Sequence, residues 1–203
     1  MSRTRSKRYE ADMANRPPGP VATAEAVTTV KAFTAGKFDQ TIELVMHLGI
    51  DPRQADQALR GSIALPNGIG QTRKVVAFCE DADIEKALEA GAAEAGNEDL
   101  IKKVQDGWTD FDVAVATPSM MKNVSKLGRV LGPTGKMPSP KAGTVSPDIA
   151  ATVKEYAAGK VEYRNDDFGN LHVPVGKMSF EADKLTENVD AFIKYMKKIK
   201  PAS

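Results

Sequence analysis

The chain has 203 residues, with 28 lysines and arginines against 27 aspartates and glutamates, and a formal net charge of +1. This length can bury one large core or two small ones, and the balanced charge lacks the basic excess that marks many nucleic-acid-binding proteins. No apolar run is long enough to span a bilayer, and the polar N-terminus is unlike a signal peptide, so we expect a soluble, cytoplasmic protein without membrane contact.

The residues that most often carry catalysis are sparse. The single cysteine, Cys79, cannot form an internal disulfide, and it follows the apolar run Val75–Phe78, so we expect a buried thiol in a reducing compartment. His47 and His172 have no nearby cysteine or spaced carboxylate pair, and they predict neither a metal site nor a triad. We therefore expect no enzyme, no metal and no cofactor.

The N-terminal part begins with a basic arm. Residues 1–20 hold five lysines and arginines and end in Pro17–Pro20, which predicts a non-helical linker. A helix follows, with Thr23 as its expected N-cap and Gly36 as its stop.

A strand with one open face is expected over residues 41–48. The even positions from 42 to 48 are apolar, whereas the odd positions are mostly polar, which is the period of a strand that buries one face only. A second short strand is expected at Ser62–Leu65.

Between Arg73 and about Gly159 the pattern becomes α/β. The expected strands are 75–79 and 111–116, and the expected helices are 83–90, 99–104, 120–127 and 149–156, the last capped by Ser146 or Asp148. Strands that alternate with helices predict a small parallel sheet.

The last part returns to alternation. Residues 161–175 predict a hairpin with a polar outer face and a turn at 165–170, and residues 182–198 predict a long amphipathic helix. The fold class is therefore α/β, with an α/β domain at about 68–159 inserted into a discontinuous domain formed by about 1–67 plus 160–203. The insert carries a net charge of −2 (11 Lys/Arg, 13 Asp/Glu) and the remainder +3 (17 and 14).

A loop rich in glycine and proline is the most distinctive stretch. Residues 127–145 read LGRVLGPTGKMPSPKAGTV, and the central GPTGKMPSPK cannot form a helix or a central strand. Two interpretations are open: phosphate contact by backbone N–H groups with Arg129, Lys136 and Lys141, or a stiff connector. A nucleotide-binding P-loop is excluded, because Val130 stands where its first glycine is needed and Met137 where its hydroxyl is needed.

The motif Gly-Pro-Thr-Gly-Lys-Met-Pro-Ser-Pro-Lys, followed by Ala-Gly-Thr-Val, resembles the central signature of the ribosomal protein L-one family, whose member forms part of the mobile stalk. Thr134, Lys136 and Ser139 depart from the usual family pattern. The resemblance is collinear from about Lys7 to Pro201. It includes Lys37–Thr41, Leu48–Arg53, Asp110–Val113, Tyr163–Asp166 and Val175–Lys177.

The resemblance implies a fold and a function. The discontinuous domain would be a ferredoxin-like split β-α-β domain, and the insert a Rossmann-like three-layer α/β domain. The implied function is that of a monomeric constituent of the large ribosomal subunit that binds ribosomal RNA, assists release of deacylated tRNA from the exit site, and represses translation by binding the leader of its own mRNA. The alternative is a free-standing RNA-binding translational regulator.

The resemblance also implies an RNA-binding set on the open face of the split domain. Its members are Lys37, Phe38, Thr41, Glu43, Arg164, Asn165, Asp166 and His172. Mixed donors and acceptors of this kind suit structured RNA, which is recognised by shape, 2′-hydroxyls and phosphates. Phe38 could stack on a base or pack under the sheet, and packing is favoured for a lone aromatic.

Two departures from the family bear on binding. Asp167 stands where the family often has lysine, which should weaken a phosphate contact. The family also continues into one more strand with a Thr-Met-Gly segment, whereas this sequence ends at Ser203, as expected of either a truncated copy or a natural variant.

Overall fold

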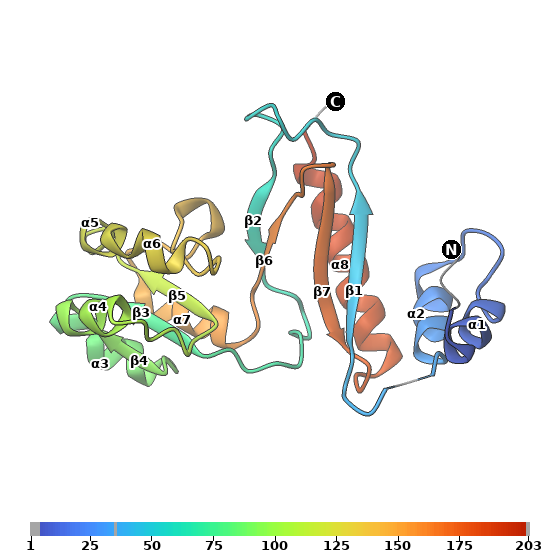
Figure 1. Ribbon diagram of the computed structural model, residues 1–203, viewed down its shortest axis with the longest axis horizontal. Helices are drawn as coiled ribbons and strands as arrows, with labels where there is room; N and C mark the ends of the chain where they lie inside the picture. Colours follow the sequence, from blue (N-terminus) through green and yellow to red (C-terminus); the bar gives the residue numbers. More distant parts are fainter. Residues whose placement is uncertain (1–4, 35, 202–203) are drawn as a thin grey trace.

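The computed structural model describes residues 5–34 and 36–201. Figure 1 shows three parts in a row: a parallel sheet with its helices, a central group of antiparallel strands backed by a long helix, and the short N-terminal helices. The mixed helices, parallel sheet and antiparallel strands confirm an α/β fold. Within the described ranges, none of the helices combines the length and apolar character that crossing a membrane requires.

The N-terminal arm contains a helix that the sequence analysis did not predict. Helix α1 spans Lys7–Ala14, and the side chain of Ser6 caps it by accepting the N–H of Tyr9 at 3.3 Å. Helix α2 spans Thr23–Lys31 and packs against the C-terminal helix. The Thr23 cap prediction is wrong, because Thr23 is the first helical residue and the preceding Ala22 has no side chain that could accept.

The central strands pair antiparallel in two ladders. Strand β1 (Thr41–His47) pairs with β7 (Asn170–Lys177), and β2 (Arg60–Ile63) pairs with β6 (Val161–Arg164). The predicted alternation along β1 is confirmed, since its odd residues are exposed and its even residues are half-buried. Among the described residues, the other edge of β1 has no strand partner.

Helix α8 (Ala182–Ile199) covers one face of these strands. Its apolar stripe, including Leu185, Phe192 and Met196, is fully buried, and the last two pack in one cluster with Tyr163 and Val173. Burying a side chain of this size contributes about 2 kcal/mol. The helix therefore decides which face of the strands is the core and leaves the opposite face to solvent.

The predicted hairpin at 161–175 forms only at its turn. Strands β6 and β7 are joined by a single bridge between Asn165 and Leu171, next to the bond from the Asp166 N–H to the Asn170 carbonyl at 2.8 Å. Continuing this ladder would require Pro174 to donate an N–H to Glu162, and proline has none. Each strand therefore takes its main partner from the N-terminal part of the chain.

The middle of the chain forms a three-stranded parallel sheet in the order β4-β3-β5. Its strands are β3 (Val75–Phe78), β4 (Glu94–Gly96) and β5 (Val113–Ala116). The surrounding helices are α3 (Asp81–Glu89), α4 (Glu98–Gln105), α5 (Met121–Val124), α6 (Gly128–Leu131) and α7 (Ile149–Ala157), with short 3₁₀ turns at Ser125–Leu127 and Pro140–Ala142. Separate apolar clusters lie on the two faces of the sheet, so helices cover both.

The predictions of a helix cap and of a buried thiol in this part are confirmed, and one strand was not predicted. Asp148 caps α7 by accepting the N–H of Ala151 at 3.0 Å, which decides between the two predicted caps. Cys79 is fully buried, as predicted, and Trp108 packs on Phe111 with ring centroids 5.4 Å apart. Strand β4 was not predicted, because its three residues carry no periodicity and exist as a strand only through pairing with β3.

The chain passes twice between the parallel sheet and the central strands. At the first passage the fully buried side chain of Asn188 accepts the N–H of Asn67 at 3.1 Å and donates to the carbonyls of Gly68 at 2.9 Å and Val175 at 2.8 Å. At the second passage Gly159 has φ +100° and lies against Gly68 and Ile69, where a side chain would meet backbone. One buried amide thus ties the first passage to both α8 and β7.

Candidate nucleic-acid interface

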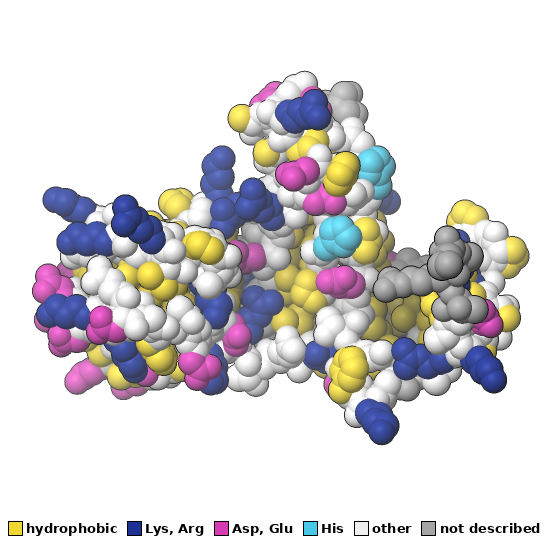
Figure 2. All heavy atoms as spheres, in the orientation of Figure 1, with side chains coloured by type: hydrophobic (Ala, Val, Ile, Leu, Met, Phe, Trp, Pro, Cys, Tyr) yellow, Lys and Arg dark blue, Asp and Glu magenta, His cyan; other side chains and the backbone are white. Residues whose placement is uncertain are grey.

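The strand face opposite α8 carries most of the predicted RNA-binding side chains. Thr41 and Glu43 are exposed on one face of β1, and the register places Glu43 opposite Pro174 and Val45 opposite His172. The bridge between Asn165 and Leu171 brings Arg164 beside His172 on this same face. We call the exposed side chains of Thr41, Glu43, Val45, His47, Arg60, Arg164 and His172 the open face. Figure 2 views the molecule from this side and shows both histidines in cyan.

Two cross-strand hydrogen bonds orient polar groups on the open face. The Lys177 ammonium donates to the hydroxyl oxygen of Thr41 at 2.8 Å. Because an ammonium is only a donor, the Thr41 oxygen accepts, and its own hydrogen is left to point to another acceptor. At the other end of β1, His47 Nδ1 lies 2.8 Å from the Asn170 amide oxygen.

A pair of arginines lies at the far edge of the open face. Arg60 and Arg164 are directly opposite across β2 and β6, both are exposed, and neither forms a salt bridge within the described part of the chain. Like charges directly opposite in an antiparallel pair repel each other. The pair therefore favours an anionic partner that lies between the two guanidinium groups.

These arginines line a cleft of about 590 Å³ whose other wall is the glycine- and proline-rich loop. Glu162, two residues before Arg164 on β6 and opposite Ser62 of β2, also lines it, and burial raises the pKa of Glu162 against the opposing charges of Arg60 and Arg73. Arg60 was not among the residues predicted to bind RNA. Arg60 is two residues before Ser62, so both side chains point to the same face of an extended chain. Only the pairing with β6 places Arg60 beside Arg164.

Asn165 and Asp166 organise the turn that closes the end of the face. The Asn165 amide oxygen accepts the N–H of Leu59 at 2.8 Å, and the Asp166 carboxylate accepts the N–H groups of Phe168 at 2.9 Å and Asn170 at 2.7 Å. The hydrogen bond from the Asn170 side chain is the largest of the effects that hold the pKa of Asp166 below its ordinary value. Asp166 also lies 3.8 Å from His172 Nε2. Asn165 and Asp166 therefore form hydrogen bonds within the protein, at the border of the open face.

Lys37 and Phe38 precede β1 and are both exposed. Phe38 is 72% exposed, so the favoured interpretation, that it packs under the sheet, is wrong, and its ring is free to stack on a base. The neighbouring Asp39 accepts the backbone N–H and the hydroxyl of Ser179 at 3.1 and 2.7 Å, which anchors this segment to the end of β7.

The three basic residues of the loop have different environments. Lys136 is half-buried, and its ammonium donates to the carbonyl oxygens of Thr109 at 2.9 Å and of Phe111, so it fastens the loop to the start of β5. Arg129 and Lys141 are exposed. Of the segment 132–141, which was predicted to be neither helix nor central strand, residues 132–139 are irregular, whereas Pro140 and Lys141 begin a 3₁₀ turn that ends at Ala142. The geometry of Lys136 favours the connector interpretation for this residue and leaves Arg129 and Lys141 accessible to solvent.

Comparison with known proteins decides the family. The model of the ribosomal protein L1p/L10e family matches residues 30–203. The large ribosomal subunit protein uL1 of Rhodopirellula baltica is 55% identical over 199 residues, which cover 98% of this chain and 88% of that protein. The protein of the same name from Protochlamydia amoebophila is 51% identical over 179 residues, covering 88% and 76% of the two chains. The chain belongs to the ribosomal protein L1p/L10e family.

Membership in the L1p/L10e family identifies a ribosomal protein, a structural component and not an enzyme, which is located on ribosomes in the cytoplasm. The cysteine and the potential metal ligands form no reactive site in the described part of the chain. Burial raises the pKa of the Cys79 thiol. In the described part of the chain no three metal-ligating side chains come together.

Proposed function

We propose that this protein is a structural constituent of the large ribosomal subunit and binds the ribosomal RNA of that subunit through the open face. The relatives named above are large-subunit proteins. The observation that carries the proposal is the gathering of Thr41, Glu43, Arg164 and His172, from strands far apart in sequence, on the one strand face that α8 leaves uncovered.

The chemistry of the open face suits structured RNA. Arg164 provides a guanidinium for phosphate, Glu43 accepts from 2′-hydroxyl or base amino groups, and the Thr41 hydroxyl, which accepts from Lys177, offers its hydrogen to an RNA acceptor. Lys37 and Phe38 extend the set with a charge and a stacking surface. Asn165 and Asp166 act by holding the turn beside His172, and Arg129 and Lys141 are secondary contacts.

We further propose that the RNA-binding part is a separate domain. Residues 1–67 plus 160–203 would form it, with 68–159 as an inserted domain, because the apolar cluster under the open face is separate from the two clusters of the parallel sheet. The positive balance of the first part, +3 against −2, supports the same division.

Filter binding with purified large-subunit ribosomal RNA tests this division. For the full chain we expect a log–log salt dependence with a slope of roughly −2 to −4, since few phosphates are neutralised. A variant that joins residues 67 and 160 through a short linker should keep this slope and most of the affinity. Loss of affinity in a variant that is folded by circular dichroism would show that the insert is needed, and a slope near zero in the full chain would argue against phosphate contact.

Two finer functions belong to the same proposal. As a monomer within the subunit, the protein would help deacylated tRNA leave the exit site, and the free protein would repress translation of its own mRNA by binding a similar RNA fold. The alternative function is a regulator that binds RNA but never joins ribosomes. We expect a tagged chain to sediment with large subunits in a sucrose gradient, and recovery only in the soluble fraction would favour the regulator.

A further inference from the structure

Helix α1 is held in place although it buries none of its own side chains. An isolated helix of eight residues is marginal in water, so its position depends on specific anchors. The main anchor is Asp12, whose carboxylate accepts the N–H and the hydroxyl of Thr34, both at 3.0 Å. Thr34 lies just after α2, and α2 packs on α8. These bonds therefore fix α1 next to the central strands.

This anchoring leaves a basic side chain without its usual partner. Arg8 and Asp12 are four residues apart on α1, a spacing that favours an ion pair. No salt bridge joins them, because the Asp12 carboxylate is turned toward Thr34, and Arg8 forms none with any other residue in the described part of the chain. Just before the helix, the Arg5 guanidinium lies 4.9 Å from the centre of the Tyr9 ring.

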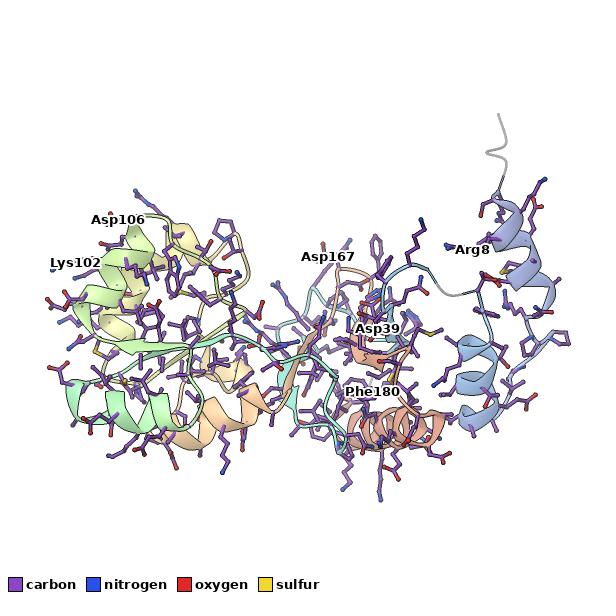
Figure 3. All side chains as sticks on the ribbon, turned by 90° about the horizontal axis from the view of Figure 1, so that it is seen from below. Arg8, Asp39, Lys102, Asp106, Asp167 and Phe180 are labelled. Carbon is purple, nitrogen blue, oxygen red and sulfur yellow. The ribbon has the colours of Figure 1, made fainter. Side chains whose placement is uncertain are left out.

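Arg8 faces a groove that is continuous with the open face. The groove has a volume of about 330 Å³ and lies between α1 and the start of β1. Its polar walls include Arg8 and Asp12 on one side and Thr41 and Glu43 on the other. Figure 3 shows Arg8 on α1, across from the segment that carries Asp39. A chain that contacts Thr41 and Glu43 therefore passes within reach of Arg8.

We propose that this groove extends the RNA-binding surface, with Arg8 binding a backbone phosphate of the same RNA that crosses Thr41 and Glu43, and with Asp12 as the positioning residue for α1. The inference rests on the proposed function. RNA is the occupant favoured here because the Arg8 guanidinium, which forms no salt bridge in the described part of the chain, complements a phosphate, and because the groove shares Thr41 and Glu43 with the open face.

A matched pair of arginine variants tests the phosphate contact. Arg8→Ala should weaken binding to purified large-subunit ribosomal RNA about fivefold at 0.1 M salt and make the log–log salt slope shallower by about 1. Arg16→Ala removes the same charge from an exposed position outside the groove, and it should change the affinity less than twofold and leave the slope unchanged. Equal effects of the two substitutions would overturn the inference, since they would indicate diffuse attraction only.

A second pair of variants separates positioning from charge. Asp12→Asn and Asp12→Ala remove the same negative charge, but only asparagine keeps an oxygen that can accept from Thr34. We expect Asp12→Asn to bind this RNA at least as tightly as the parent, and Asp12→Ala to bind it about threefold more weakly although the change makes the protein more positive. Tighter binding by both variants would show that the docked position of α1 contributes nothing.

The wild-type titration distinguishes failure of this inference from failure of the proposed function. If the parent chain binds the RNA and the Arg8 and Asp12 variants match it, the groove is not part of the interface, whereas the open face can still be. If the parent chain does not bind the RNA at all, the proposed function itself fails.

Discussion

Replacing Asn188 by leucine should destabilise the protein by about 3 kcal/mol. The side chain is fully buried on α8 and satisfies three backbone groups: the N–H of Asn67 and the carbonyls of Gly68 and Val175. Leucine is similar in size but leaves the buried Val175 carbonyl and the partly buried groups of Asn67 and Gly68 without this partner, which costs more than its apolar burial returns. Urea denaturation followed by circular dichroism would show a lower midpoint with an unchanged m-value.

The matched control lies one residue earlier on the same helix. Glu187 accepts from the Asn67 side-chain amide at 2.8 Å near the surface, so Glu187→Gln keeps an acceptor and should change the stability by less than about 0.5 kcal/mol. A loss below about 1 kcal/mol for Asn188→Leu would mean that water or a shift of the 66–70 segment satisfies the three groups, and that the passage is not tied by this amide.

Reversing the charge at Arg164 should weaken binding to large-subunit ribosomal RNA about 50-fold, which is roughly 2.3 kcal/mol. The substitution Arg164→Glu removes a guanidinium from the edge of the open face that borders the cleft and places a carboxylate where a phosphate is expected. Stability should not fall, because the new carboxylate lies opposite Arg60 and replaces a repulsive pair by an attractive one. Filter binding at fixed salt and urea denaturation measure the two quantities on the same preparation.

Lys154→Glu provides the control for net charge. Lys154 is exposed on α7, beside the parallel sheet, so the same two-unit change in charge should alter RNA affinity less than threefold. If the two reversals weaken binding equally, the RNA responds to overall charge and the open face is not the contact surface. If only Arg164→Glu weakens it and the fold is intact, the loss is local.

Local patterns were sufficient wherever the structure depends on neighbours in the chain. The two-residue alternation at 41–48 gave the open and covered faces of β1, and the apolar run before Cys79 gave a buried strand and thiol. The proline- and glycine-rich composition of 132–141 predicted irregular structure, which is found at 132–139, because φ and the N–H donors are set by residue type. The motifs of the same region also led to the correct family.

Several errors and omissions arise from pairing between distant residues, whereas the missed helix α1 and the wrong Thr23 cap are local errors. The predicted hairpin is limited to its turn, since β6 and β7 take their main partners from distant strands, and Arg60 gains a role only once it lies opposite Arg164. The sequence suggested Lys136 as a phosphate ligand. In the fold its ammonium instead donates to the carbonyls of Thr109 and Phe111. Phe38 is exposed because no apolar pocket among the described residues receives its ring, and the residues around it in the sequence do not show this.

The sequence by itself therefore determined the α/β class, the family and the polar character of the open face, since these follow from residue type and short-range periodicity. Only the tertiary structure decided which charges remain unpaired. Asp12 turns away from Arg8 because Thr34 lies within reach, and Asn188, on the apolar stripe of α8, is satisfied by groups more than ten residues away. A hydrogen bond between distant segments depends on where folding places both partners, and that position is not encoded in the neighbours of either residue.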